Sequence, residues 1–261
     1  MLLLPTWSIL HARHWKMQIP HLARHCRVLS FDGRGNGRSD RPTEPEAYRT
    51  AEFTADALAV MDATGTQRAI LVALSRGATW ALELGAGHPD RVAGIVFIAP
   101  GLALGQSAPW SAHSFTERLD TTEGWARFNQ DYWRKHYREF LEFFFAQMFS
   151  EPHSTKPIED TVGWGLETDP ETLIATQRAS RVGGPVLDPN EAADLAAQLR
   201  CPVLVIHGDK DAIRPLVNGA KLAELACGEL VILGGSGHAP HVRDPVRVNL
   251  LLLDFIRRSR P

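Results

Sequence analysis

Apolar residues along this chain gather in short runs that turn residues separate. Within each run the apolar residues are nearly continuous and do not alternate with polar ones, which is typical of parallel strands covered on both faces. We therefore predict six strands of a mostly parallel, buried sheet. The runs lie at residues 2–4, 27–31, 69–74, 92–98, 203–207 and 229–233.

Helical patterns lie between most of these runs. Residues 50–63 place Phe53, Ala57, Leu58 and Met61 at helical spacing. Residues 188–199 open with Asp-Pro-Asn-Glu, a capping sequence with proline at the first helical position. This alternation of strand and helix predicts an α/β fold with a doubly wound sheet.

The alternation stops once, between residues 100 and 188, where no segment resembles a strand. We predict a helical cap at residues 101–188, inserted between a strand that ends near Ile98 and one that begins near Val203. The core domain then comprises residues 1–100 and 189–261. The inserted stretch holds 13 of the 21 aromatic residues.

Those aromatic residues fit two interpretations. They can form the core of a small helical subdomain, or they can belong to a lid that lines a ligand pocket. For the second interpretation the pocket candidates are Trp7, Trp133 and Phe144. One helical face of "YREFLEFFFAQMF" carries Tyr137, Phe140, Leu141, Phe144, Phe145 and Met148.

Length and composition narrow the class of protein. A chain of 261 residues fits a single large core. Its 28 Lys and Arg nearly balance 30 Asp and Glu without a long run of either sign, so neither nucleic acid nor an anionic membrane is an expected partner. Three widely spaced cysteines and the lack of a membrane-spanning run favour a cytoplasmic protein, as a monomer or homodimer.

Residues 69–82 begin as a strand and continue as a helix, with Ser75 at the change. A serine nucleophile on such a turn adopts strained backbone angles, so the residues two before and two after it must be small. Ala73 and Gly77 occupy these positions in "ALSRG". The sequence alone also fits a helix-capping serine.

A nucleophilic serine needs a histidine that takes its proton and a carboxylate that orients the histidine. In "CPVLVIHGDKDAIRP" a strand ends at His207, and a turn presents Asp209 and Asp211. In "ELVILGGSGHAPHVRDP" a glycine-rich loop delivers His238. The order Ser, Asp, His at the ends of successive predicted strands predicts a catalytic triad.

The chain resembles the α/β-hydrolase superfamily, in the branch of serine esterases and lactonases, through "FDGRGNGRSDRP", "LVALSRGATWALELGAGHPDRV", "VLVIHGDKDAIRP" and "GGSGHAPHVRDP". The resemblance implies Asp211 as the triad acid, Asp209 as a brace for its loop, and His238 rather than His241 as the base.

The same resemblance implies two backbone N–H donors for an oxyanion. One belongs to Arg76, and the other to Ser8, or to Trp7 if the alignment slips by one residue. Many relatives read His-Gly at the loop that here reads "LPTWSILHARHW". The Arg76 side chain fits either a substrate anchor or a contact with the cap.

The expected chemistry is hydrolysis of a carboxylic ester or lactone of a small, fairly apolar acyl compound through an acyl-enzyme. Carbon–carbon bond hydrolysis, acyl transfer and a small-molecule receptor with slow turnover remain alternatives. We expect no cofactor, and no metal, since His11, His14, His21 and His25 lack accompanying ligands at metal-binding spacing.

Members of this superfamily ordinarily have an antiparallel hairpin before the strand that begins here at Leu2. We therefore expect about 20 to 30 residues upstream of Met1, the length of two strands with their turns. Without them the strand at residues 27–31 forms an uncovered sheet edge.

Overall fold

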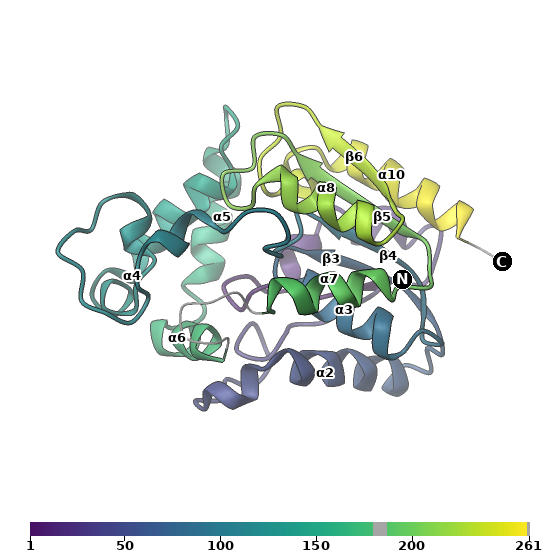
Figure 1. Ribbon diagram of the computed structural model, residues 1–261, viewed down its shortest axis with the longest axis horizontal. Coiled ribbons are helices and arrows are strands. Elements are labelled where there is room, and N and C mark those ends of the chain that lie inside the picture. Colours follow the sequence, from purple (N-terminus) through teal and green to yellow (C-terminus); the bar gives the residue numbers. More distant parts are fainter. Residues whose placement is uncertain (180–186, 260–261) are drawn as a thin grey trace.

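A six-stranded parallel sheet forms the centre of the computed structural model, which describes residues 1–179 and 187–259 (Figure 1). The strand order is β2-β1-β3-β4-β5-β6, and every neighbouring pair is parallel. The predicted α/β class and all six strands are confirmed, although the first two are only two residues long. The strands are β1 (Leu2–Leu3), β2 (Leu29–Ser30), β3 (Ala69–Leu74), β4 (Val92–Ile98), β5 (Val203–Gly208) and β6 (Glu229–Leu233).

Helices cover both faces of this sheet, which explains the continuous apolar runs. Leu71 and Ala73 of β3 pack in one buried cluster with α2, α3, α7 and α8. Val72 and Leu74 point to the opposite face and pack in a cluster with α10. The covering helices are α1 (Ile19–Leu22), α2 (Thr50–Ala63), α3 (Gly77–Gly87), α7 (Pro189–Ala197), α8 (Leu216–Leu225), α9 (Pro240–Arg243) and α10 (Pro245–Arg258).

The Asp-Pro-Asn-Glu sequence caps a helix as predicted. Asp188 is the N-cap of α7, and its carboxylate accepts a hydrogen bond from the N–H of Asn190 at 2.9 Å. Pro189 is the first residue of the helix. The cap thus satisfies one of the N–H groups that a helix leaves free at its start.

Between β4 and α7 the regular elements among the described residues are all helical. They gather at one end of the molecule, opposite the C-terminus (Figure 1). Their aromatic side chains belong to the same buried cluster as Leu3, Val96 and Ile98 of the sheet, so the cap and the core share one apolar interior. The segments are η3 (Pro109–Ala112), η4 (Gly124–Arg127), α4 (Gln130–Met148), α5 (Thr155–Gly165) and α6 (Pro170–Arg178).

Strand β2 is an outer strand, as predicted for residues 27–31. Two short 3-10 helices, η1 (Ala12–Trp15) and η2 (Pro45–Tyr48), lie in the connections after β1 and β2. The hairpin expected upstream of Met1 stays a prediction.

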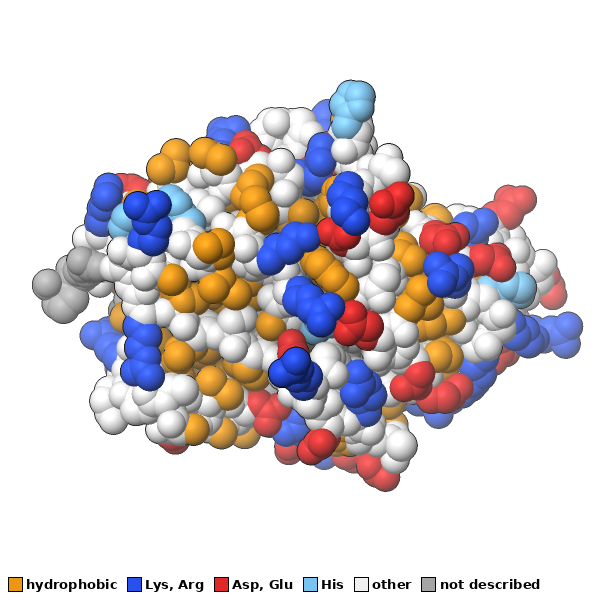
Figure 2. Space-filling model, turned by 180° about the vertical axis from the view of Figure 1, so that it is seen from behind, with side chains coloured by type: hydrophobic (Ala, Val, Ile, Leu, Met, Phe, Trp, Pro, Cys, Tyr) orange, Lys and Arg blue, Asp and Glu red, His pale blue; other side chains and the backbone are white. Residues whose placement is uncertain are grey.

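No helix among the described residues is long and apolar enough to cross a membrane. Figure 2 shows acidic and basic side chains interspersed over the face of the molecule that it presents.

Candidate active site

Ser75 lies on a strained turn between β3 and α3. Its φ angle is 51°, in the left-handed region that L-residues rarely adopt. A Cβ atom at Gly77 would lie 2.6 Å from the carbonyl oxygen of Pro5, so only glycine fits there. Ala73 is fully buried and does not have a positive φ, which explains why alanine is tolerated two residues before the serine.

Gly101, which the sequence analysis did not single out, holds this turn from the side of β4. Its N–H donates to the carbonyl oxygen of Ser75 at 2.8 Å. A Cβ atom at Gly101 would lie 2.7 Å from the carbonyl carbon of Ser75, so a side chain would push the turn away. A glycine soon after the strand, in "IAPG", is the sequence feature that could have indicated this close contact between two backbone segments.

Asp211 and His238 form a buried pair beyond the ends of β5 and β6. Nδ1 of His238 donates to Oδ2 of Asp211 at 2.8 Å. This bond fixes the tautomer that leaves Nε2 of His238 free to accept a proton. The side chain of Asp211 has no exposed surface, and that of His238 is 2% exposed.

The carboxylate of Asp211 accepts further hydrogen bonds. Its Oδ1 accepts from the backbone N–H groups of Ile213 and Arg214, both at 2.8 Å. Burial opposes ionisation of Asp211. The charge of His238 and the hydrogen bonds from His207 and His238 outweigh that effect and hold the pKa of the carboxyl well below its usual range. Asp211 is therefore an anion at every pH at which the protein is expected to work.

His207 is a site neighbour that the sequence analysis treated only as a strand end. Its Nε2 lies 3.1 Å from Oδ2 of Asp211 and 3.0 Å from the carbonyl oxygen of Arg214. Both partners are acceptors, so Nε2 carries the hydrogen and donates. His207 thus contacts the same carboxylate oxygen as His238.

The loop that carries His238 passes directly over the end of β5. A Cβ atom at Gly208 would overlap the carbonyl oxygens of Ser236 and Gly237, so glycine permits this approach. The loop is also fastened by Asp209, whose Oδ1 accepts from the N–H of Gly235 at 2.6 Å. This bond matches the bracing role that the family resemblance implied for Asp209.

The C-terminal end of the cap helix α4 supports the His238 loop from the other side. The N–H of His238 donates to the carbonyl oxygen of Met148 at 3.2 Å. The N–H of Gly237 donates to Oε1 of Glu151 at 2.8 Å. Nothing in the sequence pattern pointed to Met148 or Glu151, because these contacts join segments about 90 residues apart.

Ser75 is brought to the same edge of the sheet as the Asp211–His238 pair, since all three follow the carboxyl ends of parallel strands. Within residues 1–179 and 187–259, no hydrogen bond joins the Ser75 hydroxyl to His238. Catalytic hydrogen bonds are often long before substrate binds, so this geometry is compatible with a triad.

The loop after β1 lies against the turn that carries Ser75. The Thr6 hydroxyl donates to the carbonyl oxygen of Leu74 at 3.0 Å. Ser8 is held by its own hydroxyl, which donates to the carbonyl oxygen of Arg34 at 2.9 Å, and by Asn36, whose amide donates to the Ser8 carbonyl. These bonds keep the backbone of residues 6–8 beside Ser75, where an oxyanion donor is needed.

The three pocket candidates lie together in the aromatic cluster. The ring of Trp7 is 5.8 Å from that of Trp133 and 5.3 Å from that of Phe144, measured between centroids. Trp133 has no exposed surface, while Trp7 and Phe144 keep 7% and 6%. These contacts fit the packing interpretation, and contact with a substrate stays a prediction.

Arg76 extends its side chain from the serine turn to the cap. Its guanidinium donates to the side-chain oxygen of Gln177 at 2.8 Å and to the carbonyl oxygen of Thr176 at 3.3 Å. It also lies 5.3 Å from the centroid of the Trp7 ring. The side chain therefore connects the serine turn, the loop after β1 and helix α6.

His241 is not the partner of Asp211. Its Nε2 lies 3.1 Å from Nδ1 of His14, in a buried pair that joins α9 to η1. Burial, followed by the charge of His238, lowers the pKa of His241 to about 3. Burial, followed by the charge of His241, lowers the pKa of His14 well below its usual value.

In the described part of the chain, no group of three or more His, Cys, Asp or Glu side chains could hold a metal ion.

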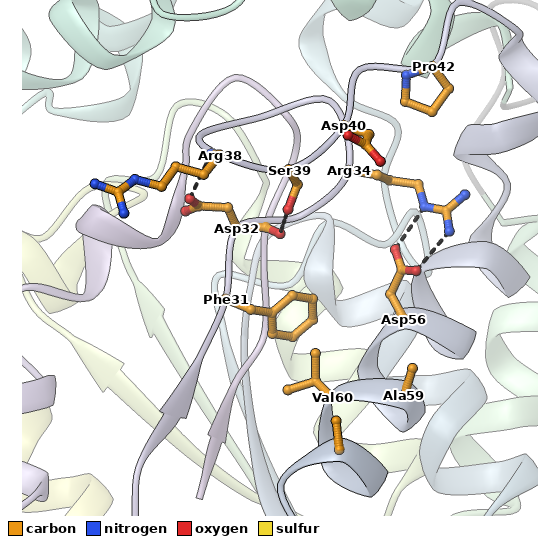
Figure 3. Close-up of a pocket in the computed structure, with 11 residues that line it drawn as sticks. Phe31, Asp32, Arg34, Arg38, Ser39, Asp40, Pro42, Asp56, Ala59 and Val60 are labelled. Carbon is orange, nitrogen blue, oxygen red and sulfur yellow. Dashed lines mark hydrogen bonds and ion pairs between the residues drawn. The ribbon is translucent and has the colours of Figure 1, made fainter.

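A cavity of about 570 Å³ lies away from this site, between α2 and the loop that follows β2 (Figure 3). Its apolar lining comes from Phe31, Pro42, Ala59, Val60 and Ala63. Arg34 points to Asp56 there, and the two groups form a bidentate ion pair, with Nε to Oδ2 and Nη2 to Oδ1 both at 2.8 Å. The lining includes none of the predicted site residues.

Comparison with known proteins agrees with this architecture. The chain is 29% identical over 249 residues to the 2-hydroxymuconate semialdehyde hydrolase of Pseudomonas sp. (strain CF600), covering 94% of this chain and 82% of that protein. Among solved structures, the enol-lactonase from Burkholderia xenovorans LB400 has a TM-score of 0.78 at 22% identity, covering 98% of this chain and 90% of that one.

The esterase RhEst1 from Rhodococcus sp. ECU1013 also has a TM-score of 0.78, at 24% identity, covering 99% of this chain and 90% of that one. These two likenesses are of fold. Residues 4–245 match the family described as alpha/beta hydrolase fold, which spans nearly all of the sheet and the cap. The chain therefore belongs to the alpha/beta hydrolase fold family.

Proposed function

We propose that this protein is a serine hydrolase of carboxylic esters or lactones, with Ser75 as nucleophile, His238 as general base and Asp211 as the orienting acid. The carrying observation is the combination of two features at one edge of the sheet. Ser75 lies on a strained strand-to-helix turn, with φ of 51°. His238 donates to the buried carboxylate of Asp211 at 2.8 Å.

In the first half of the proposed reaction the Ser75 hydroxyl attacks the carbonyl carbon of the substrate. Its proton passes to Nε2 of His238, while the Nδ1–H of His238 stays with Asp211. The tetrahedral intermediate then collapses, the bond from carbon to the leaving oxygen breaks, and His238 returns the proton to that oxygen. The product of this half is an acyl group on Ser75.

In the second half a water molecule attacks the acyl carbon. His238 takes a proton from the water and then gives it to the Ser75 oxygen as the acyl bond breaks. The ionised carboxylate of Asp211 stabilises the imidazolium that forms in each half. The low pKa of Asp211 supports this role, because the carboxylate does not take the proton from His238.

Two N–H groups are proposed to stabilise the oxyanion. One is the backbone N–H of Arg76, which follows Ser75 at the start of α3, where the helix dipole also favours negative charge. The other is the N–H of Ser8 or Trp7, since the loop after β1 is fastened to Leu74 by Thr6. Loss of one such donor typically costs about 10²- to 10³-fold in rate.

The aromatic cluster around Trp7, Trp133 and Phe144 supports a substrate whose acyl part is mostly apolar. We propose a small molecule as the partner, with no cofactor in the reaction. The three free cysteines, Cys26, Cys201 and Cys227, support a reducing cytoplasm as its location.

The test is active-site labelling with a fluorophosphonate, with the adduct located by mass spectrometry. We expect labelling at Ser75 alone. The Ser75→Ala variant should lose about 10⁶-fold in kcat for aryl esters if the triad acts as a unit. Labelling at Ser8 or Ser236, or undiminished turnover by Ser75→Ala, would overturn the assignment. A single slow turnover followed by a large conformational response would favour the receptor alternative.

A second candidate is hydrolysis of a carbon–carbon bond by the same residues. It is favoured by the 29% identity to the 2-hydroxymuconate semialdehyde hydrolase over 94% of this chain. A direct comparison of kcat/KM for 2-hydroxymuconate semialdehyde and for aryl esters decides between the two. A value at least 10² times higher for the semialdehyde would replace the ester as the proposed substrate.

A further inference from the structure

Two arginines flank the serine and the acid of the proposed triad. Arg76 follows Ser75 directly, and Arg214 lies three residues after Asp211. Both side chains reach the cap: Arg76 donates to Thr176 and Gln177, and Arg214 lies 4.7 Å from the ring centroid of Trp110. Both guanidinium groups therefore lie at the junction of cap and core.

Arg214 makes no side-chain hydrogen bond or ion pair within residues 1–179 and 187–259, although its Nε is buried. Its backbone is fully used, since its N–H donates to Asp211 and its carbonyl oxygen accepts from His207. A buried, charged donor without a partner is costly. These backbone bonds fix the position of residue 214, and no described residue accepts a hydrogen bond from its guanidinium.

Arg76 also has N–H groups from which no described residue accepts a hydrogen bond. A guanidinium has five N–H donors, and the described contacts of Arg76 use two, to Thr176 and Gln177. Neither contact is to a carboxylate. Ser75, Arg76 and Arg214 each keep part of their surface exposed. The charge of Arg214 contributes to the lowered pKa of Arg76, so the two guanidinium groups lie near each other.

Two other arginines of this protein pair with carboxylates. Arg34 forms a bidentate ion pair with Asp56 (Figure 3), and Nη2 of Arg91 lies 2.6 Å from Oδ1 of Asp62. The pair with Asp56 raises the pKa of Arg34. The pKa values of Arg76 and Arg214 shift in the opposite direction and are lowered. Burial, followed by the charge of Arg214, lowers the pKa of Arg76 to about 9.

The charges around the site do not balance. Burial lowers the pKa of Arg214 to about 10, against the opposing effect of the Asp211 charge. Both arginines are therefore cations at neutral pH, and Asp211 is an anion. The three groups carry a net charge of one positive unit.

We propose that Arg76 and Arg214 together bind a carboxylate on the substrate, so that the preferred substrates are esters or lactones whose acyl part ends in an acid group. Arginine presents paired N–H groups that match the two oxygens of a carboxylate. This inference rests on the proposed ester hydrolysis at Ser75. It changes the expectation of an entirely apolar acyl compound to one with an apolar chain and a single terminal carboxylate.

The experiment compares two series of methyl esters. The first are monomethyl esters of four- to seven-carbon dicarboxylic acids. The second are methyl esters of equal length in which a neutral acetyl group replaces the free acid group. Acid release is followed by titration at pH 7.5, and the measured quantity is the ratio of the two kcat/KM values. We expect the wild-type protein to prefer the acidic ester by about 10- to 100-fold at the best chain length, the usual effect of a charged hydrogen bond.

Arg214→Met should remove most of this preference, because the side chain keeps its volume and loses its charge. Arg91→Met is the matched control: Arg91 is paired to Asp62 away from the site, and its loss should leave the ratio unchanged. Equal kcat/KM values for the acidic and neutral esters in the wild-type protein would overturn the inference. A preference that survives in Arg214→Met would overturn it as well.

A binding measurement separates this inference from the proposed function. If neither ester is hydrolysed, the proposed function fails, and calorimetric titration with adipate then tests the arginines alone. Binding of adipate to the wild-type protein that is at least tenfold weaker in Arg214→Met supports the carboxylate site without turnover. Absence of binding, or equal binding by both proteins, overturns it. If neutral esters are hydrolysed without any preference for acids, only the carboxylate site fails.

Discussion

Nε2 of His207 lies 3.1 Å from Oδ2 of Asp211, the carboxylate oxygen that also accepts the hydrogen bond from His238. His207 has no exposed surface and is held at the end of β5, so it positions the acid without reaching a substrate itself. Its second acceptor, the carbonyl oxygen of Arg214, ties the same imidazole to the turn that follows Asp211.

Replacing His207 should therefore affect turnover more than substrate binding. We expect His207→Leu to lower kcat by about 10- to 100-fold with KM nearly unchanged, since Asp211 loses one of its charge-assisted hydrogen bonds and is less well oriented. His207→Gln retains an N–H donor and should recover most of the activity. Steady-state kinetics of the two variants, with circular dichroism to verify folding, checks this. Equal losses in both variants would mean a purely steric role.

The two aspartates after β5 should differ sharply. Asp211→Asn should lower kcat by about 10⁴-fold, because an amide favours the wrong tautomer of His238. Asp209→Asn should mainly lower stability, since Asp209 is exposed and its carboxylate accepts from the N–H of Gly235 but makes no hydrogen bond to His238 among the described residues. Kinetics and thermal unfolding of both variants decide. The reverse ranking in kcat would transfer the role of triad acid to Asp209.

The φ angle of 51° at Ser75 predicts a stability gain on changing the nucleophile. Ser75→Gly should have a free energy of unfolding about 1 kcal/mol higher than Ser75→Ala, because glycine adopts a left-handed conformation without the clash of a Cβ atom. Urea denaturation measures the difference. As a control, Ala78→Gly in helix α3 should lower the free energy of unfolding, and a higher stability of Ser75→Ala than of Ser75→Gly would contradict strain at the turn.

The buried His14–His241 pair predicts a loss of stability in acid. His241, with its pKa lowered to about 3, stays neutral in the folded protein, whereas in the unfolded chain it takes up a proton below about pH 6.5. The unfolded state then binds more protons, so the free energy of unfolding decreases as the pH falls from 6.5 toward 3, by up to about 1.4 kcal/mol per pH unit for each such histidine.

Urea unfolding at several pH values between 4.5 and 7.5 measures this dependence. His241→Gln should flatten it, because glutamine stays neutral and can still hydrogen-bond to His14. His153→Asn is the matched control: His153 is exposed, and asparagine tolerates its φ of 61°. An unchanged slope in His241→Gln would exclude the pair as the source of acid sensitivity.

Trp133 should matter more for stability than its position in the cap suggests. It is fully buried, and its indole N–H donates to the carbonyl oxygen of Arg127 at 3.0 Å. Trp133→Ala should lower the free energy of unfolding by about 3 to 5 kcal/mol. Phe144→Ala, measured in parallel over a series of acyl lengths, tests the pocket interpretation. A changed acyl-length preference in either variant would support contact with the substrate.

The order of strands and helices followed from the sequence because it depends on local periodicity. Strands β3, β4 and β6 and helix α2 have the bounds that their apolar patterns predicted. The same pattern predicted polar groups after β3, β5 and β6, because parallel strands end at one edge of the sheet. The choice of Asp211 over Asp209 and of His238 over His241 came from the family resemblance.

The tertiary structure decided which groups surround that edge. His207 and Arg214 gain their roles from the fold of one turn around Asp211, while Met148 and Glu151 of the cap reach the His238 loop across about 90 residues of sequence. Whether an arginine pairs with a carboxylate depends on packing between segments far apart in the chain. The local periodicity of the sequence contains no information on the distance between such segments. The sequence thus determined the chemistry that the sheet can present, and only the packing of the cap decided that Arg214 has no carboxylate partner among the described residues.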